Sequence, residues 1–288
     1  MILCLCLIIA GLPILMTLVF QGDEILLDTD SNEMQHKSSH PDEEEKMAAL
    51  VSILARDIPV TYEEEAIRAQ AVIVRTNYEY ALSQGKAPET GLSVAEQTKL
   101  FGNENYNRYY QKLENCLIDT EGEVLTYQGQ EIEAPYFAVS AEKTRGTELP
   151  YLKSAESIWD ITSEDFLKVE FYDAGELVDT CNQAFPEAGL TTEDWVNTLV
   201  VTEREESGYV KTIQVGNSSV SGEEFRKAFS LNSGCFYIRE IDGRVRIVTK
   251  GLGHGYGLSI YGANEMAKEG KTYQEILSYY YSGIEITK

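Results

Sequence analysis

The segment from Gly251 to Ala267, GLGHGYGLSIYGANEMA, constrains the fold of this chain more than any other stretch. Glycine occupies every second position from its start and surrounds His254, the only histidine outside the first 40 residues. Glycine is costly in regular structure and is used where the backbone needs a positive φ or lies close to another group. The pattern predicts a ribbon bare of side chains that presents one imidazole beside Ser259 and Tyr261. A polymer or a ring could approach such a ribbon closely.

Other uses of the glycine run and its histidine fit less well. A dinucleotide loop of the form G-x-G-x-x-G needs glycine where Tyr256 stands. A lipase-type oxyanion loop is accompanied by a G-x-S-x-G nucleophile elbow, which the sequence lacks. A nucleophilic pair of Cys235 with His254 remains as an alternative. Cys235 lies in a predicted strand, where a buried inert thiol is the better interpretation.

Composition separates the N-terminal part of the chain from the rest. Residues 1–21 are largely apolar and uncharged, and about 20 such residues span a bilayer. We expect a transmembrane anchor here, with a cleaved signal peptide as the alternative. Residues 22–46 are polar and acidic and are expected to form a linker. Residues 47–288 are then expected to form one extracytoplasmic domain of a single-pass cell-membrane protein.

Charge and cysteine spacing exclude several classes of function. The formal net charge is −23, which argues against nucleic acid as a partner because phosphate binding needs clustered Lys and Arg. Cys116, Cys181 and Cys235 are far apart, and none stands at metal-ligand spacing from a histidine. We therefore expect no metal and no cofactor. One disulfide among these cysteines stays open, with its partners undetermined.

Periodicity and turn residues predict an α+β fold. Its main helix is long and Ala-rich, runs from Tyr62 to Leu82, and is expected to begin with a capping box from Thr61 to Glu64. Further helices are expected at 47–55, 221–229, 263–268 and from Thr272 to Gly283. Antiparallel strands are expected at 123–127, 136–139, 209–215, 235–241 and 244–249.

Three separated stretches match one known family in order and spacing. They are RDIPVTYEEEAIRAQAVIVRT (Arg56–Thr76), SGEEFRKAF (Ser221–Phe229) and the run from Gly251 to Gly283. Together they resemble the stage II sporulation protein D family, which includes the LytB-type amidase enhancers. The resemblance covers about residues 47–283.

The resemblance implies a role at peptidoglycan. Family members of the sporulation type are membrane-anchored lytic transglycosylases that cleave glycan strands stripped of stem peptides, and they drive engulfment during sporulation. It implies a cell-wall amidase and another membrane sporulation protein as partners. The alternative is a glycan-binding amidase enhancer without catalysis.

The resemblance places the catalytic acid at Asp57, where the family has a Glu. A lytic transglycosylase needs one carboxyl group, which first gives and then takes a proton, so we expect its pKa to be raised. Asp is one methylene shorter than Glu, and catalytic geometry is sensitive to such a change. Alternatively, Asp57 only caps the turn before Pro59. Glu65 matches a family glutamate and either substitutes for the acid or forms a cap or salt bridge.

Further site residues follow from the same resemblance. The expected substrate-binding residues are Gln70, Gly253, His254, Gly255, Ser259 and Tyr261. Gln70 either contacts the acid or a sugar, or makes a structural hydrogen bond; His254 positions the acid or the sugar. Arg75 is expected to bind main-chain carbonyls, and Tyr136 and Tyr256 are candidates for stacking on sugar rings. The segment at 137–145 departs from the family's Ser- and Gly-rich turn. Some relatives hold a metal nearby through Cys and His, which are absent from 117 to 160.

Overall fold

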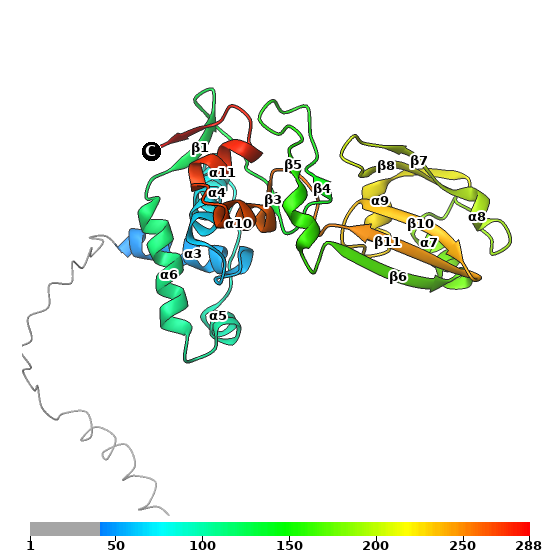
Figure 1. The fold of residues 1–288 in the computed structure, drawn as a ribbon, viewed down its shortest axis with the longest axis horizontal. Coiled ribbons are helices and arrows are strands. Elements are labelled where there is room, and N and C mark those ends of the chain that lie inside the picture. The colour runs from blue at the N-terminus through cyan, green and yellow to red at the C-terminus, as the bar shows by residue number, and fades with distance from the viewer. Residues whose placement is uncertain (1–40) are drawn as a thin grey trace, which may run out of the picture. The chain divides into compact units, whose positions relative to one another are not determined.

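The computed structural model describes residues 41–288 (Figure 1). The predicted anchor and most of the predicted linker lie outside the described residues. Within residues 41–288, none of the helices has both the length and the apolar character needed to cross a membrane.

Helix α4 (Glu64–Ser83) lies at the centre of the first hydrophobic core, as Figure 1 shows in cyan. Ala66, Ala69 and Ala71 are completely buried on it, and such small side chains let neighbouring helices approach closely. The helices packed around it come from both ends of the described chain: α3 (Pro41–Asp57), α6 (Tyr106–Asp119), α10 (Ile260–Lys268) and α11 (Tyr273–Tyr280). α5 (Val94–Phe101) packs on α3 and α6.

A small antiparallel sheet completes this helical part. Its order is β13 (Glu285–Thr287), β1 (Val124–Tyr127) and β2 (Gln130–Glu131). Because β13 closes on β1, the last residues of the chain are fixed against the segment that follows α6.

The second core lies between two three-stranded antiparallel sheets and their helices. One sheet has the order β10 (Cys235–Ile241), β11 (Arg244–Lys250), β6 (Leu167–Asp173), and the other β7 (Leu199–Arg204), β8 (Val210–Val215), β9 (Ser218–Ser221). Phe225 stacks on Phe229 and Phe236 within this core. The accompanying helices are α7 (Ala174–Ala184), α8 (Trp195–Thr198) and α9 (Gly222–Ala228).

Short elements between the two cores carry the predicted strand at 136–139 and part of the glycine-rich segment. β3 (Tyr136–Phe137) pairs in parallel with β12 (Leu258–Ser259), and β4 (Glu142–Lys143) pairs with β5 (Glu156–Ser157). The 3-10 helix η1 (Ile158–Thr162) follows β5. The pairing of β3 with β12 brings the glycine-rich segment beside the predicted strand at 136–139.

The mixed α+β class is confirmed, but several elements differ from the expectation. The strand expected to be antiparallel at 136–139 is β3, which pairs in parallel with β12, and α5, α6, α7, β6 and β7 were not expected from the sequence. The capping box predicted at Thr61 is wrong: α4 begins at Glu64, its N-cap Glu63 makes no side-chain cap, and Asn264 Oδ1 accepts the Glu63 N–H instead. The capping box at Thr272 is confirmed. α3 begins at Pro41, earlier than the predicted start of the first helix.

Candidate functional site

Asp57 is the last residue of α3, and its carboxyl group is enclosed by two donors. Arg56 Nε donates to Oδ1 at 2.7 Å, and the Tyr136 hydroxyl donates to Oδ2 at 2.5 Å. Only 5% of the Asp57 side chain is exposed. Burial raises the pKa of Asp57, while the bonds from Arg56 and Tyr136 oppose the rise. The carboxyl group thus holds its proton to higher pH than an exposed aspartate does, as expected of a catalytic acid.

Tyr136 connects this carboxyl group to the glycine-rich segment. Its hydroxyl reaches Asp57, and its main chain pairs with Leu258 on β12. Burial, followed by the charge of Asp57, raises the pKa of Tyr136 well above its usual range, so this hydroxyl stays protonated and donates. The structure therefore brings Asp57 and the segment of His254 together through Tyr136, for which the sequence predicts only stacking on a sugar ring.

His254 contacts the main chain of Tyr136, not its hydroxyl group. Its ring makes a hydrogen bond to the main chain of Tyr136 and packs against Phe137 with ring centroids 5.7 Å apart. Nδ1 accepts the Tyr256 N–H at 3.1 Å, which leaves Nε2 as the donor. Burial lowers the pKa of His254. The ring is therefore a neutral imidazole at neutral pH that holds β3 in place beside the acid.

The glycines of this segment are required by packing within the protein. Gly253 and Gly255 have φ of 116° and 89°, which side chains disfavour. A Cβ at Gly253 would lie 2.7 Å from Phe137 Cβ, and one at Gly255 would lie 2.6 Å from the Tyr209 ring. The ribbon is bare of side chains, as predicted, but the protein's own residues occupy the space that we assigned to an approaching polymer.

Ser259 belongs to a buried cluster around Asp160. Its hydroxyl donates to Asp160 Oδ1 at 2.6 Å and accepts the N–H of Gly262 in the first turn of α10. Ser157 Oγ and the Ser140 N–H also donate to Asp160. Ser259 is completely buried, so the predicted contact of its hydroxyl with a sugar is not possible in this structure. Its role is to cap a helix and solvate a buried carboxylate.

The remaining predicted residues differ in their surroundings. Tyr261 is half-buried, and its hydroxyl lies 3.1 Å from Thr162 Oγ1. Gln70 is completely buried on α4, and neither atom of its amide has a hydrogen-bond partner among the described residues. The structural hydrogen bond expected for Gln70 is therefore absent from this part of the chain.

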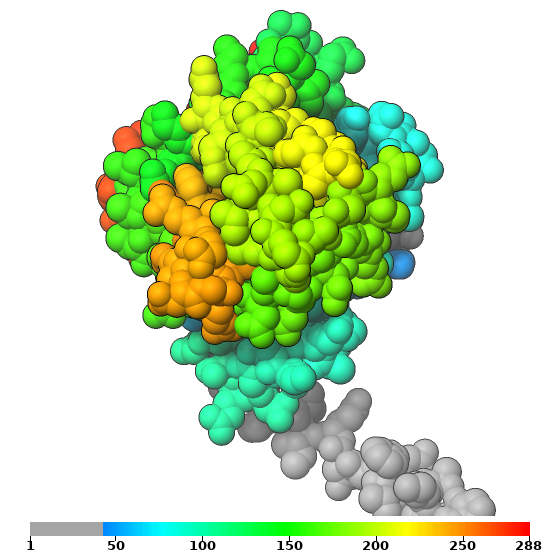
Figure 2. All heavy atoms as spheres, turned by 90° about the vertical axis from the view of Figure 1, so that its right-hand side faces the viewer, coloured from blue at the N-terminus to red at the C-terminus, as the bar shows by residue number. Residues whose placement is uncertain are grey.

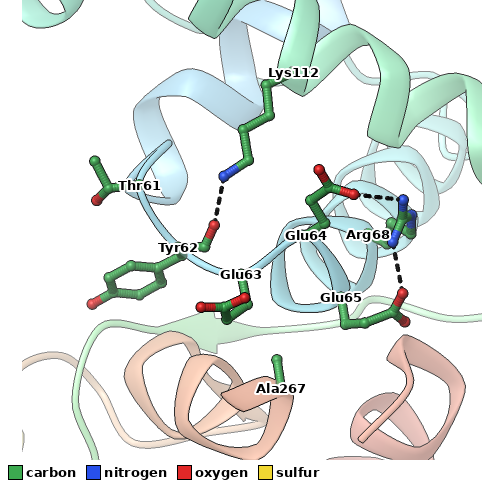
Figure 3. Close-up of a pocket in the computed structure, with 8 residues that line it drawn as sticks. All are labelled: Thr61, Tyr62, Glu63, Glu64, Glu65, Arg68, Lys112 and Ala267. Atoms are coloured by element: carbon green, nitrogen blue, oxygen red, sulfur yellow. Dashed lines mark hydrogen bonds and ion pairs between the residues drawn. The ribbon is translucent and has the colours of Figure 1, made fainter. Parts of the chain in front are cut away.

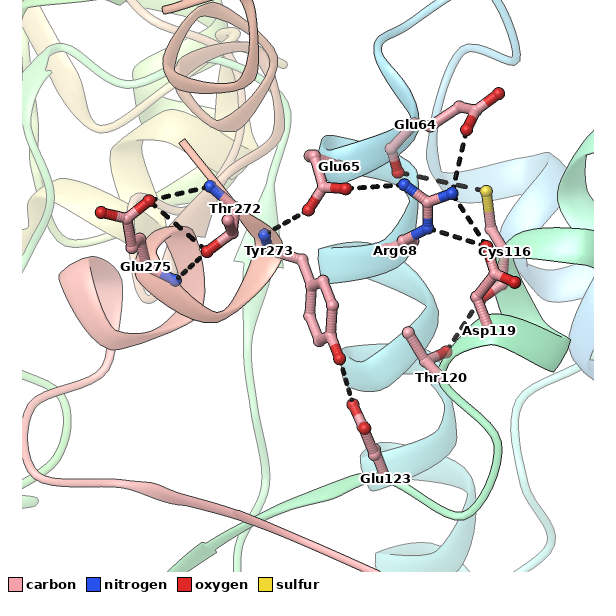
Figure 4. A network of polar contacts seen from close by, with 10 residues as sticks. All are labelled: Glu64, Glu65, Arg68, Cys116, Asp119, Thr120, Glu123, Thr272, Tyr273 and Glu275. Carbon is pink, nitrogen blue, oxygen red and sulfur yellow. Dashed lines mark hydrogen bonds and ion pairs between the residues drawn. The ribbon is translucent and has the colours of Figure 1, made fainter. Parts of the chain in front are cut away.

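Arg75 and Glu65 fix the helices around α4. Arg75 donates to the carbonyls of Leu117, Thr120 and Glu123, so its expected role is confirmed. Glu65 accepts from Arg68 Nη1 at 2.6 Å and from the N–H of Tyr273, the first residue of α11, at 2.7 Å (Figure 4). Glu65 thus acts as both salt bridge and cap. Its carboxylate is fully engaged, which favours these roles over that of a substitute acid.

A hollow of about 430 Å³ lies at the start of α4 and shares Glu65 and Arg68 with the contacts just described (Figure 3). Lys112 projects into it, and its ammonium donates to the carbonyls of Val60 and Tyr62. Neither Asp57 nor His254 lines it. The lining residues are Thr61, Tyr62, Glu63, Glu64, Glu65, Arg68, Lys112 and Ala267.

Cys235 is buried, and its thiol donates to the Gly208 carbonyl. Burial raises its pKa, so a thiolate paired with His254 is not formed at neutral pH. Cys116 and Cys181 are likewise free and buried.

Arg56 and Asp160 are not among the site residues expected from the sequence, and Tyr136 is expected there only as a residue that stacks on a sugar ring. Arg56 adjoins Asp57 in the chain and could have been proposed from that adjacency. Tyr136 and Asp160 join the site through contacts over 79 and 99 residues, with Asp57 and Ser259, and no local pattern carries such information.

Comparison with known proteins agrees with the motif resemblance. The family model of the stage II sporulation protein SpoIID matches residues 45–127. Stage II sporulation protein D of Bacillus subtilis is 30% identical over 259 residues, which cover 83% of this chain and 73% of that protein. The protein of the same name from Bacillus amyloliquefaciens matches equally well, at 30% over 259 residues. The amidase enhancer of Bacillus subtilis is 22% identical over 293 residues, covering 83% of this chain and 40% of that protein. This chain belongs to the stage II sporulation protein D family.

Proposed function

We propose that this protein is a lytic transglycosylase, anchored in the cell membrane, that cleaves peptide-stripped glycan strands of peptidoglycan during sporulation. Family membership and the amidase-enhancer relative support a role at the cell wall. The observation that carries the catalytic part is the state of Asp57: one carboxyl group, buried, with a raised pKa and a tyrosine hydroxyl on Oδ2.

The chemistry needs only this one group. Protonated Asp57 gives its proton to the glycosidic oxygen, and the bond from that oxygen to the anomeric carbon of muramic acid breaks. The ring passes through an oxocarbenium-like state. The C6 hydroxyl of the same sugar then attacks the anomeric carbon and returns its proton to the Asp57 carboxylate. The product is an anhydro-muramic acid end, no water is consumed, and the acid is regenerated.

The neighbours of Asp57 have defined parts in this sequence. The Tyr136 hydroxyl donates to Oδ2 and thereby stabilises the carboxylate that exists between the two proton transfers. Arg56 holds Oδ1 and fixes the direction of the group. His254 acts at one remove, because its neutral ring holds the main chain of Tyr136. His254 and Tyr136 are positioning residues in this proposal.

A second candidate function is a glycan-binding amidase enhancer that does not cleave. Two observations favour it: Arg56 forms an ion pair with Asp57 Oδ1, and only 5% of the Asp57 side chain is exposed. A group held in this way gives up a proton to substrate only if the Arg56 contact loosens when the strand binds.

Product analysis separates the two candidates. Peptide-free glycan strands are incubated with the protein, and the soluble fraction is analysed by mass spectrometry for anhydro-muramic acid ends. Retention of strands on the immobilised protein is measured in parallel. Anhydro-ended fragments support the transglycosylase, whereas retained and intact strands support the enhancer and overturn the catalytic proposal.

A further inference from the structure

The sheet of β6, β11 and β10 has one face in the core and one face open. Phe236, Val245 and Ile247 point into the second core. On the opposite face an antiparallel sheet normally presents polar residues to water. Here β6 and β10 instead expose large apolar side chains, with exposed fractions of 52% for Leu167, 39% for Val169, 47% for Phe171 and 37% for Tyr237. Contiguous exposed apolar residues of this kind mark interaction surfaces.

Arginines without acidic partners stand in the same face. Arg239 on β10 lies directly opposite Arg246 on β11, and Arg246 in turn lies opposite Phe171 on β6. Neither arginine forms an ion pair within residues 41–288. Like charges directly opposite each other across strands destabilise a sheet. An anion placed between the two guanidinium groups removes that repulsion.

A third arginine extends the cluster toward the neighbouring sheet. The Arg204 guanidinium lies over the Tyr237 ring at 4.3 Å and donates only to the main-chain carbonyls of Gly208 and Phe236. Arg244, on the same face, shows the contrast, since it pairs with Asp173 on the adjacent strand. We call Arg204, Arg239, Arg246, Phe171 and Tyr237 the arginine face. The hairpin of β10 and β11 reaches the surface in orange in Figure 2.

The charge of the whole chain makes the arginine face informative. The chain has 47 acidic and only 24 basic residues, yet three arginines gather on this face and none of them forms an ion pair within residues 41–288. Guanidinium groups bind carboxylates through two parallel hydrogen bonds, and exposed aromatic rings pack against the apolar faces of sugar rings. A ligand that alternates sugar rings with carboxylates satisfies both parts of the face.

We propose that the arginine face binds the glycan strand outside the cleavage site, through the lactyl carboxylates of muramic acid. This inference rests on the proposed function and names the feature of the strand that is recognised. Each lactyl group is an amide while a stem peptide is attached and becomes a free carboxylate when an amidase removes the peptide. The face therefore selects strands after peptide removal.

The test measures binding and does not require cleavage. The full-length protein with Asp57→Asn is compared with the same protein carrying Arg239→Gln and Arg246→Gln. Strands are used in two forms, peptide-free and peptide-free with the lactyl carboxyl groups reduced to alcohols. The matched control carries Lys99→Gln and Arg108→Gln, which remove two positive charges from α5 and α6, and circular dichroism checks that each variant is folded.

The two arginine substitutions should weaken binding of peptide-free strands about tenfold or more, which is the scale of losing charge-assisted bonds. Strands with reduced carboxyl groups should bind the parent protein as weakly as peptide-free strands bind the double variant. With these reduced strands, the two arginine substitutions should have little further effect. The control variant should bind like its parent. Equal binding of peptide-free strands by the parent and the double variant overturns the inference. So does a double variant that loses binding to a phosphate polymer such as teichoic acid while its binding of glycan strands is unchanged.

The outcome is separable from the proposed function. If strand binding depends on the lactyl carboxylate but the wild-type protein forms no anhydro-ended product, the role of the arginine face is supported and the transglycosylase proposal is contradicted. If the wild-type protein forms the product but its strand binding does not depend on the lactyl carboxylate, the transglycosylase proposal is supported and the role of the arginine face is contradicted.

Discussion

The hydrogen bond from Tyr136 to Asp57 Oδ2 is the contact on which the pKa of the proposed acid most directly depends. The donor favours the carboxylate, so Tyr136→Phe should raise the pKa of Asp57 further. The alkaline limb of the pH profile of kcat/KM for anhydro-product formation should then move to higher pH. The free energy of unfolding should fall by only about 1 kcal/mol.

Tyr273→Phe is the matched control for this substitution. It removes a tyrosine hydroxyl that donates to another carboxylate, Glu123. It should leave the alkaline limb in place. An unshifted limb in Tyr136→Phe, with the protein folded, would contradict the assigned role of Tyr136.

Asp160 gives a pH dependence of stability whose sign can be stated. Burial raises its pKa from 3.8 to about 6, so the folded protein binds this proton more tightly than the unfolded chain. Between about pH 6 and pH 4 the group adds stability as the pH falls, by about 3 kcal/mol for a shift of two units. Above the folded pKa that contribution is lost, because both states are then ionised.

The variant Asp160→Asn tests this directly. The amide does not titrate, so the variant lacks the gain on acidification, whereas all other carboxyl groups are common to both proteins. The melting temperature of the wild type minus that of the variant should be larger at pH 5 than at pH 7.5. A difference that is the same at both pH values would show that Asp160 is not the titrating group.

At the scale of elements, the glycine-rich segment depends on close approach to the chain that leads into β3. Gly257 has a φ of 75°, and a Cβ there would lie 1.8 Å from the Pro135 carbonyl oxygen. Gly257→Ala should therefore lower the free energy of unfolding by about 3 kcal/mol or more, through both steric overlap and strain. Chemical denaturation measures the change.

Gly270→Ala separates the two causes. Gly270 has a φ of 87° with nothing within 4 Å of the added Cβ, so its cost should be the backbone strain alone, about 1 kcal/mol. Equal losses for the two variants would mean that overlap with the Pro135 carbonyl contributes nothing.

Local signals made some elements predictable and left others hidden. α4 and α11 follow from apolar periodicity, and Thr272 caps α11 within its own turn. The cap at Thr61 failed because Asn264, 201 residues away, bonds the Glu63 N–H. β6 reads LKVEFYD, which alternates as a strand should, yet its apolar positions face solvent. A pattern that assumes burial of apolar positions gives no guide to the arginine face.

The candidate site shows the same division. The sequence placed Asp57, His254 and the glycines by motif, and Arg75 was understood from the need of a buried guanidinium for carbonyls. Tyr136 as partner of Asp57 and the burial of Ser259 against Asp160 depend on the pairing of β3 with β12, a long-range contact that periodicity does not contain.

At the scale of the whole described molecule, Arg145 joins the turn between β7 and β8, whose strands line the second core, to the glycine-rich segment, which leads into α10 of the first core. Its guanidinium pairs with Glu205, donates to the His254 carbonyl and lies over the Tyr256 ring at 4.4 Å. Arg145→Gln should cost about 3 kcal/mol, because Glu205 loses its partner in a largely buried place. It should also make the unfolding of the two cores less cooperative.

The two tryptophans report on the cores separately. Trp195 lies in the second core and Trp159 packs against the first, so single-tryptophan proteins follow each by fluorescence during urea unfolding. In the Arg145→Gln background the two transitions should separate. Lys143→Gln, which removes an exposed ion pair with Glu156, should leave them coincident with a loss under about 0.5 kcal/mol.

The central claim is that the Asp57 carboxyl group is the acid and base of glycan cleavage. The most direct measurement is mass spectrometry of peptide-free strands treated with wild type, Asp57→Asn and Asp57→Glu, with strand retention measured for each. We predict anhydro-muramic acid ends from wild type, none from Asp57→Asn at unchanged retention, and restored product from Asp57→Glu. Undiminished product from Asp57→Asn would contradict the account.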